Sequence, residues 1–157
     1  METDRTFAMD FMSVIARFNN ESDRGAVLIC SSYLEDLLKQ LLRRNLKEGK
    51  GLQDLFDGKN PPLGSFEARI AACHAMGLID DRMRSDLNIV RGIRNEFAHK
   101  WDADISSGSI ADRCIELGNR DWTEKTKDVF ESSPSPRQAY IYSSMAMFMS
   151  LRGDGPK

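Results

Sequence analysis

The chain has few residues of the kinds that mark several functional classes. It contains three cysteines and two histidines in 157 residues, and Cys73 beside His74 lacks the spacing of zinc ligands. No apolar run approaches the roughly 20 residues of a membrane-spanning helix, and no basic stretch followed by an apolar one opens the chain. These absences predict a protein with no metal site, no cofactor and no membrane span.

Neither sign of charge dominates the composition. The formal net charge is −2 and the pI is about 5.7, which argues against a surface devoted to duplex DNA but leaves room for a local basic groove. Cys30, Cys73 and Cys114 are isolated and have apolar neighbours, so we expect buried thiols and a reducing, cytoplasmic location. Acidic residues near position 80 (Asp80, Asp81 and Asp86) are interpreted as helix-start charge and solvated surface.

Apolar residues recur at helical spacing through most of the chain, and no stretch alternates as a strand would. The sequence therefore predicts an all-α single domain, a bundle of about five to seven helices over residues 1–151, with residues 152–157 as a frayed tail. Residues 47–64 should form a loop with one short turn, and residues 102–109 a second loop. Helices are expected over residues 6–18, 22–46, 65–76, 80–101, 110–117 and 136–151.

Capping residues support these boundaries. Ser22 or Asp23 can begin the second helix and Ser65 the third, because their side chains accept the free amide hydrogens of a first turn. Gly77 is placed to end the third helix, and Pro136 suits the first turn of the last one. That last helix is rich in methionine, which predicts core filling or a dimer seam rather than a cofactor site.

The stretch from Arg91 to His99 concentrates polar chemistry on a helix with an apolar stripe. Ile93, Phe97 and Trp101 recur every four residues, so we expect all three to face the core, with Trp101 half-buried at the helix end. The alternative for Trp101 is that its ring stacks on a base. Gly92 costs helix stability, which indicates the close approach of another helix, for example across a dimer axis.

The polar residues of this stretch do not all share a face. Asn95 and His99 lie on nearly the same face, whereas Arg94 and His99 diverge by roughly 140 degrees on an ideal helix. For both to contact one phosphate, the helix must fray near His99, the arginine must bend, or a second copy must complete the site. A purely structural alternative is that Asn95 and His99 cap helix carbonyls while Arg94 pairs with Glu96, Glu67 or Asp102.

The segment from Arg94 to His99 resembles the Arg-x4-His signature of HEPN domains, which are helical and occur in many ribonucleases. The resemblance implies a homodimer that cleaves RNA without a metal ion, with Arg94, Asn95 and His99 as the catalytic group. His99 would exchange a proton with the ribose 2′-hydroxyl or the leaving oxygen, and Arg94 would neutralise the phosphate.

A second resemblance, over residues 21–117, is to the mannitol operon repressor family of small helical bacterial proteins. It implies a transcriptional regulator, yet no helix-turn-helix is recognisable, because the helix after Gly77 begins with two acids that DNA phosphates would repel. Repression would then act through RNA or a protein partner, at a surface edged by Arg91, Lys100, Trp101 and Arg69. Regulator and ribonuclease both remain open. The segments that carry the resemblance are Glu21–Arg24, Pro62–Ile70, Gly77–Ile79 and Ile93–His99.

Overall fold

The computed structural model describes residues 13, 15–121 and 134–153, and within these ranges the chain is helical without a strand. This confirms the all-α prediction. A short helical segment covers residues 15–20, and six further helices have defined bounds. They are α2 (Asp23–Asn45), α3 (Lys50–Phe56), α4 (Phe66–Ala75), α5 (Asp81–His99), α6 (Gly108–Asp121) and α8 (Pro136–Arg152).

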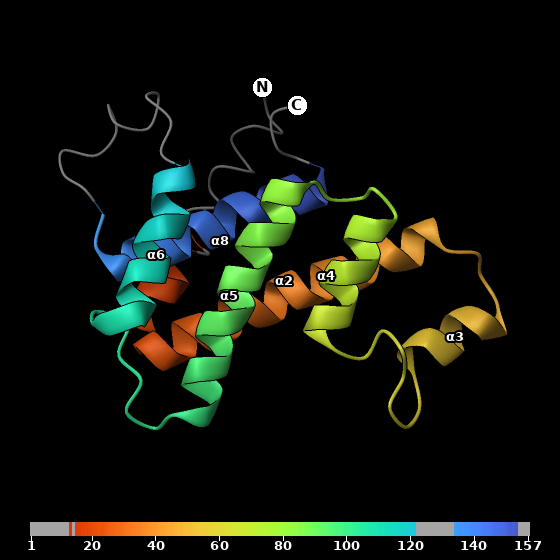
Figure 1. Cartoon of the computed structure of the whole chain (residues 1–157), viewed down its shortest axis with the longest axis horizontal. Helices are drawn as coiled ribbons and strands as arrows, with labels where there is room; N and C mark the ends of the chain where they lie inside the picture. The colour runs from red at the N-terminus through yellow and green to blue at the C-terminus, as the bar shows by residue number, and fades with distance from the viewer. Residues whose placement is uncertain (1–12, 14, 122–133, 154–157) are drawn as a thin grey trace.

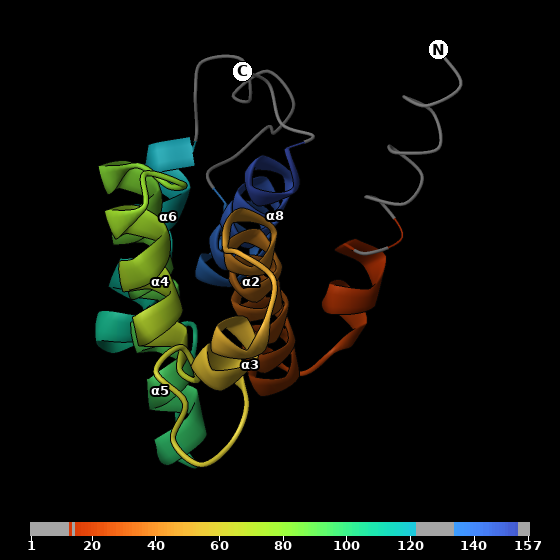
Figure 2. The ribbon, with the colours of Figure 1, turned by 90° about the vertical axis from the view of Figure 1, so that its right-hand side faces the viewer.

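The helices form two packed layers (Figures 1 and 2). One layer holds α4, α5 and α6 side by side, with α5 in the middle, and the second holds α2 and α8 behind them. Helix α3 lies away from this packing, at one end of α2. Because α5 is in the outer layer, one of its faces packs on the second layer and the opposite face points away from the molecule.

The predicted capping residues begin three of the helices. The Ser22 hydroxyl accepts the amide hydrogen of Gly25 at 3.0 Å, and that of Ser65 accepts the amide hydrogen of Ala68 at 3.1 Å. Ser135 and Gln138 form a reciprocal capping box before Pro136. Gly77 has a φ of +69°, which suits glycine after the end of α4.

The core runs between the two layers and includes the three thiols that the sequence predicted to be buried (Cys30, Cys73 and Cys114). Met145 and Met147 of α8 are buried in it, as expected of a methionine-rich core helix. Arg137 joins the start of α8 to the segment before α2 by donating to the carbonyls of Phe18 and Glu21, each at 2.7 Å.

Several boundaries differ from the prediction. Helix α3 makes two turns where a loop with a single turn was expected, and α6 begins at Gly108, inside the predicted second loop. Helix α8 includes Arg152, assigned to the tail, and ends at Gly153 with a φ of +83°. Most of the predicted first helix lies outside the described residues. None of the described helices is long and apolar enough to cross a membrane.

Asp86 corrects one interpretation. It was assigned to solvated surface, but its exposed fraction is 4%. The residue lies on the same side of α5 as Leu87 and Val90, facing the core. Arg82, one turn earlier, approaches its carboxylate at 3.8 Å, so a buried charge gains a nearby cation.

Candidate functional site

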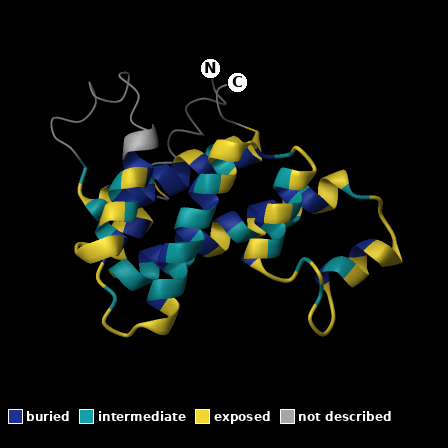
Figure 3. Cartoon of the chain, viewed as in Figure 1, coloured by how far each residue is buried: buried dark blue, intermediate teal, exposed yellow. Residues whose placement is uncertain are grey.

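Helix α5 presents different residues to the core and to the outside. Its buried face comprises Leu87, Val90, Ile93 and Phe97, each no more than 1% exposed. The opposite face is intermediate to exposed and points away from the second layer (Figure 3). At the spacing of a helix, this outward face carries small or polar side chains, from Ser85 through Asn88, Gly92 and Asn95 to His99.

Arg94 and His99 diverge around α5, and the structure shows where the Arg94 side chain lies. Helix α5 stays regular to its last residue, His99, and the following amide of Lys100 still donates to the Glu96 carbonyl at 2.8 Å. Fraying is therefore excluded as the means of aligning the motif. The Arg94 side chain is directed at its neighbour, and its Nη1 donates to Asn95 Oδ1 at 3.1 Å. That a second copy completes the site stays a prediction. Asn95 lies one turn before His99 and roughly 40 degrees from it around the helix.

His99 itself is exposed, in the last turn of α5. Among the described residues, none forms a hydrogen bond or an ion pair with its imidazole. The capping alternative is therefore wrong for His99, and Asn95 accepts from Arg94 rather than capping a carbonyl. The proposed acidic partners of Arg94 are also wrong. Glu67 pairs with Arg91 at 3.2 Å, Glu96 pairs with other cations, and among the described residues no ion pair joins Arg94 to Asp102.

The turn after α5 is held by Arg24 of α2, a residue whose role the sequence did not reveal. Its Nη2 donates to the carbonyls of Lys100 and Trp101 at 2.7 and 2.9 Å, and its guanidinium lies 5.7 Å from the centre of the Phe97 ring. These contacts satisfy carbonyls beyond the helix end. They also fix the backbone from which Lys100 and Trp101 project.

Trp101 was predicted to close the core, and this was wrong. Its exposed fraction is 91%. The chain leaves the helix at Lys100, whose φ and ψ are extended, so the four-residue spacing that includes Ile93 and Phe97 stops before Trp101. Ile105, four residues after Trp101, is the residue that packs into the core, and its exposed fraction is 1%. Trp101 consequently projects from the same end of α5 as His99.

Glu96 controls the charge beside this end. Its carboxylate lies 2.5 Å from Lys100 Nζ and 3.4 Å from Arg113 Nη2 of α6. The hydrogen bond from Lys100, together with the charges of Lys100 and Arg113, lowers the pKa of Glu96 below its usual value. Glu96 therefore stays ionised near neutral pH and offsets part of the charge of these two cations.

Two of the predicted edge residues serve packing. Arg69 of α4 is partly buried, and it donates to the Leu63 carbonyl at 2.9 Å and pairs with Glu35 of α2 at 3.4 Å. Arg91 is held by Glu67. Arg94, Asn95, His99, Lys100 and Trp101 are thus the predicted site residues that gather at the C-terminal end of α5, and we call them the α5-end surface.

A side chain does lie close to Gly92, as the sequence predicted, but it belongs to Arg113 of the same chain. A side-chain carbon at Gly92 would lie 2.9 Å from Arg113 Nη1. The missing side chain thus lets the Arg113 guanidinium lie across α5 and reach Glu96. No second copy is needed to explain this glycine.

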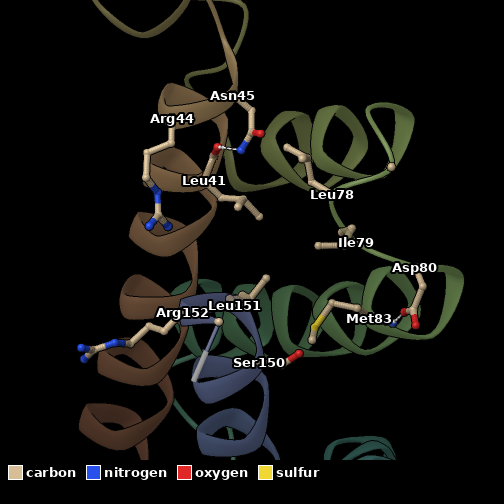
Figure 4. A pocket seen from close by; sticks show the side chains of 12 residues that line it. Leu41, Arg44, Asn45, Leu78, Ile79, Asp80, Met83, Ser150, Leu151 and Arg152 are labelled. Atoms are coloured by element: carbon tan, nitrogen blue, oxygen red, sulfur yellow. Dashed lines mark hydrogen bonds between the residues drawn. The ribbon is translucent and has the colours of Figure 1, made fainter. Parts of the chain in front are cut away.

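Two hollows in the described chain are lined by residues other than those of the α5-end surface. A hollow of about 800 Å³ separates the ends of α2 and α8 from the turn between α4 and α5, with Leu41, Leu78, Met83 and Leu151 among its lining residues (Figure 4). A second hollow, of about 590 Å³, lies beside α5 between Asp81 and Ile89. In the described parts of the chain, no three histidine, cysteine or acidic residues gather as metal ligands would.

Comparisons with known protein families, with curated proteins and with solved structures find no match for this chain.

Proposed function

We propose that this protein regulates gene expression in the manner implied by its resemblance to the mannitol operon repressor family, and that it acts by binding single-stranded RNA. The observation that carries the proposal is the α5-end surface. There an exposed indole, an exposed imidazole and a guanidinium that has no carboxylate partner in the described parts of the chain project from one helix end. Among the described residues, Arg94 donates to Asn95 of the same helix, and no hydrogen bond or ion pair involves the side chain of Trp101 or His99.

The chemistry of this surface suits an unpaired strand. An exposed tryptophan can stack on any base, and single-stranded RNA offers unstacked bases. Arg94 can bind a phosphate in a fixed orientation, because Asn95 holds its guanidinium. Duplex DNA fits less well, because the net charge is −2 and Glu96 offsets nearby cations.

A second candidate function is metal-independent RNA cleavage, which the exposure of His99 favours. The exposed His99 imidazole, which has no hydrogen-bond partner among the described residues, can take the proton of a ribose 2′-hydroxyl. That oxygen would attack the adjacent phosphorus, the bond to the next nucleotide's 5′-oxygen would break, and the products would be a cyclic phosphate and a 5′-hydroxyl. Arg94 would stabilise the charge that builds on the phosphate. The HEPN resemblance further implies a homodimer.

One experiment separates the two functions. The parent, Arg94→Ala and His99→Ala proteins are incubated with cellular RNA in EDTA, after sedimentation has established their oligomeric state. RNA length, cyclic phosphate ends and retention on filters are measured. Arg44→Ala is the matched control for retention, because it removes an arginine away from the α5-end surface. His74→Ala is the matched control for cleavage alone, because His74 pairs with Asp81 and its loss also alters the charge beside α5.

For a regulator, we expect retention of RNA that Arg94→Ala weakens, without cleavage. Cleavage by the parent and both controls, but not by His99→Ala, would instead establish the ribonuclease. If the parent neither retains nor cleaves RNA, both proposals are wrong. Equal retention and cleavage by all five proteins would likewise remove the α5-end surface from either function.

A further inference from the structure

The outward face of α5 carries a second place suited to a phosphate. The hollow of about 590 Å³ is lined by Asp81, Arg84, Ser85, Asn88, Ile89 and Arg113. It lies on the same side of the helix as Asn95 and His99, because positions 88, 95 and 99 differ by no more than about 40 degrees around the axis. The hollow therefore opens on the side of α5 that carries Asn95 and His99. Arg94 leaves the helix on a different side, and its guanidinium meets this one at Asn95, to which it donates at 3.1 Å.

The arginines of α5 fall into two groups. Arg82 and Arg91 approach the carboxylates of Asp86 and Glu67 at 3.8 and 3.2 Å. Arg84 and Arg94 have no carboxylate partner among the described residues. Arg94 lies in the α5-end surface, and Arg84 lines the hollow about 15 Å away along the helix axis.

The remaining groups around the hollow leave Arg84 able to bind an anion. The carboxylate of Asp81 is 2.7 Å from His74 Nε2, and is therefore already engaged with α4. The Asn88 amide nitrogen donates to the Arg84 carbonyl at 3.0 Å, which anchors one wall. Arg113 lines the opposite wall, positioned over the gap left by Gly92.

We infer that the outward face of α5 is a track for one RNA strand, with one phosphate at Arg94 and a second, further along the strand, at Arg84. This inference rests on the proposed function and extends it to the length of RNA recognised. A strand that reaches only the α5-end surface gains one arginine contact. A longer strand spans the roughly 15 Å to the hollow and gains the second.

The test compares oligonucleotide length with an Arg84 variant. Affinities of the parent and Arg84→Gln are measured by fluorescence anisotropy, with oligouridylates from a dinucleotide to about 16 nucleotides. Arg44→Gln, at the far end of α2, is the control for loss of one charge. We use a catalytically silenced background, His99→Ala, if the parent cleaves RNA.

We expect Arg84→Gln to weaken binding of the longer strands by about five- to tenfold and to leave the dinucleotide unchanged. The slope of log affinity against log salt should fall by about 0.7, as for one lost phosphate contact with a single strand. Arg44→Gln should behave as the parent.

Two outcomes would overturn the inference, and they are distinguishable from failure of the proposed function. If long strands bind through Arg94 but Arg84→Gln changes neither affinity nor salt slope, the track is wrong and the α5-end surface stands. If Arg84→Gln and Arg44→Gln weaken binding equally, the effect is one of net charge and the track is again wrong. If no oligonucleotide binds the parent, the proposed function fails and the track with it.

Discussion

At the scale of single residues, the exposed fraction distinguishes side chains that stabilise the fold from side chains that are available to bind a ligand. Phe97 and Trp101 are four residues apart, yet the first is 1% exposed and the second 91%. The difference arises because α5 ends between them and Arg24 turns the backbone away. A large apolar side chain projecting this far into solvent contributes little to folding and is available for a ligand.

Replacing Trp101 by alanine tests whether this side chain binds RNA without stabilising the fold. We expect the free energy of unfolding to change by less than about 0.5 kcal/mol, because the side chain has almost no packing to lose. RNA affinity should fall by about 1–3 kcal/mol, the range for loss of one stacked base. Urea unfolding and anisotropy with an oligouridylate measure the two effects.

Trp101→Phe provides the matched control, since it keeps an aromatic face and should retain most of the affinity. A loss of about 3 kcal/mol or more in stability for Trp101→Ala would show that the indole is packed, contrary to the exposure described here. Unchanged RNA affinity in both variants would remove stacking from the proposed function.

At the scale of elements, α6 reaches across α5 where α5 lacks a side chain, at Gly92. Arg113 crosses α5 over Gly92 and reaches Glu96, while its own Nε donates to the Ser109 carbonyl at 3.1 Å. The neighbour of Gly92 is therefore the flexible tip of a side chain rather than a backbone. Such a tip can move aside, whereas a helix backbone cannot.

Gly92→Ala should therefore leave stability unchanged or raise it by up to about 1 kcal/mol. The gain in helix propensity is about 1 kcal/mol, and displacing a partly exposed ion pair costs between nothing and about 1 kcal/mol. Urea unfolding of Gly92→Ala, Arg113→Gln and the double variant gives the coupling between the two positions. The alanine should stabilise more when Arg113 is absent.

A loss of more than about 1 kcal/mol for Gly92→Ala, with no relief in the double variant, would mean that something other than Arg113 packs on this glycine. A second copy of the chain would then be the first candidate, and the loss should depend on protein concentration.

At the scale of the whole molecule, helix positions could be predicted from the sequence, but the use of individual polar side chains could not. Ser22, Ser65 and Pro136 mark helix starts through local geometry that sequence spacing records. The end of α5 was predicted within two residues, and that small error was enough to misplace Trp101 in the core.

Contacts with other helices account for most of the remaining differences between the predicted and the observed roles of the polar side chains. Arg69 and Arg91 look like surface cations in the sequence, and only the packing of α4 on α2 and α5 brings Glu35 and Glu67 to them. Arg94 bends onto its own neighbour Asn95, a choice of rotamer that spacing does not encode. Burial of Asp86 likewise depends on which side of α5 meets the core.

The three buried thiols predict how the whole molecule responds to alkaline pH. Burial raises the pKa of Cys30 and Cys114 from 9.0 to about 12, and that of Cys73 to about 11. Above pH 9 the unfolded chain releases these protons while the folded chain keeps them. Unfolding then becomes more favourable as the pH rises, so the contribution of the thiols is complete below about pH 9 and is lost between about pH 9 and 12.

We therefore expect the free energy of unfolding to fall above about pH 9 under reducing conditions, by at most about 1.4 kcal/mol per pH unit for each thiol. Urea unfolding between about pH 8 and 10 measures the slope before most lysines lose their charge. A variant with all three cysteines replaced by alanine is less stable throughout, because cavities remain, but its slope over this window should be much flatter. Equal slopes for the two proteins would show that the thiols are accessible to water in the folded chain, and that the alkaline sensitivity has another source.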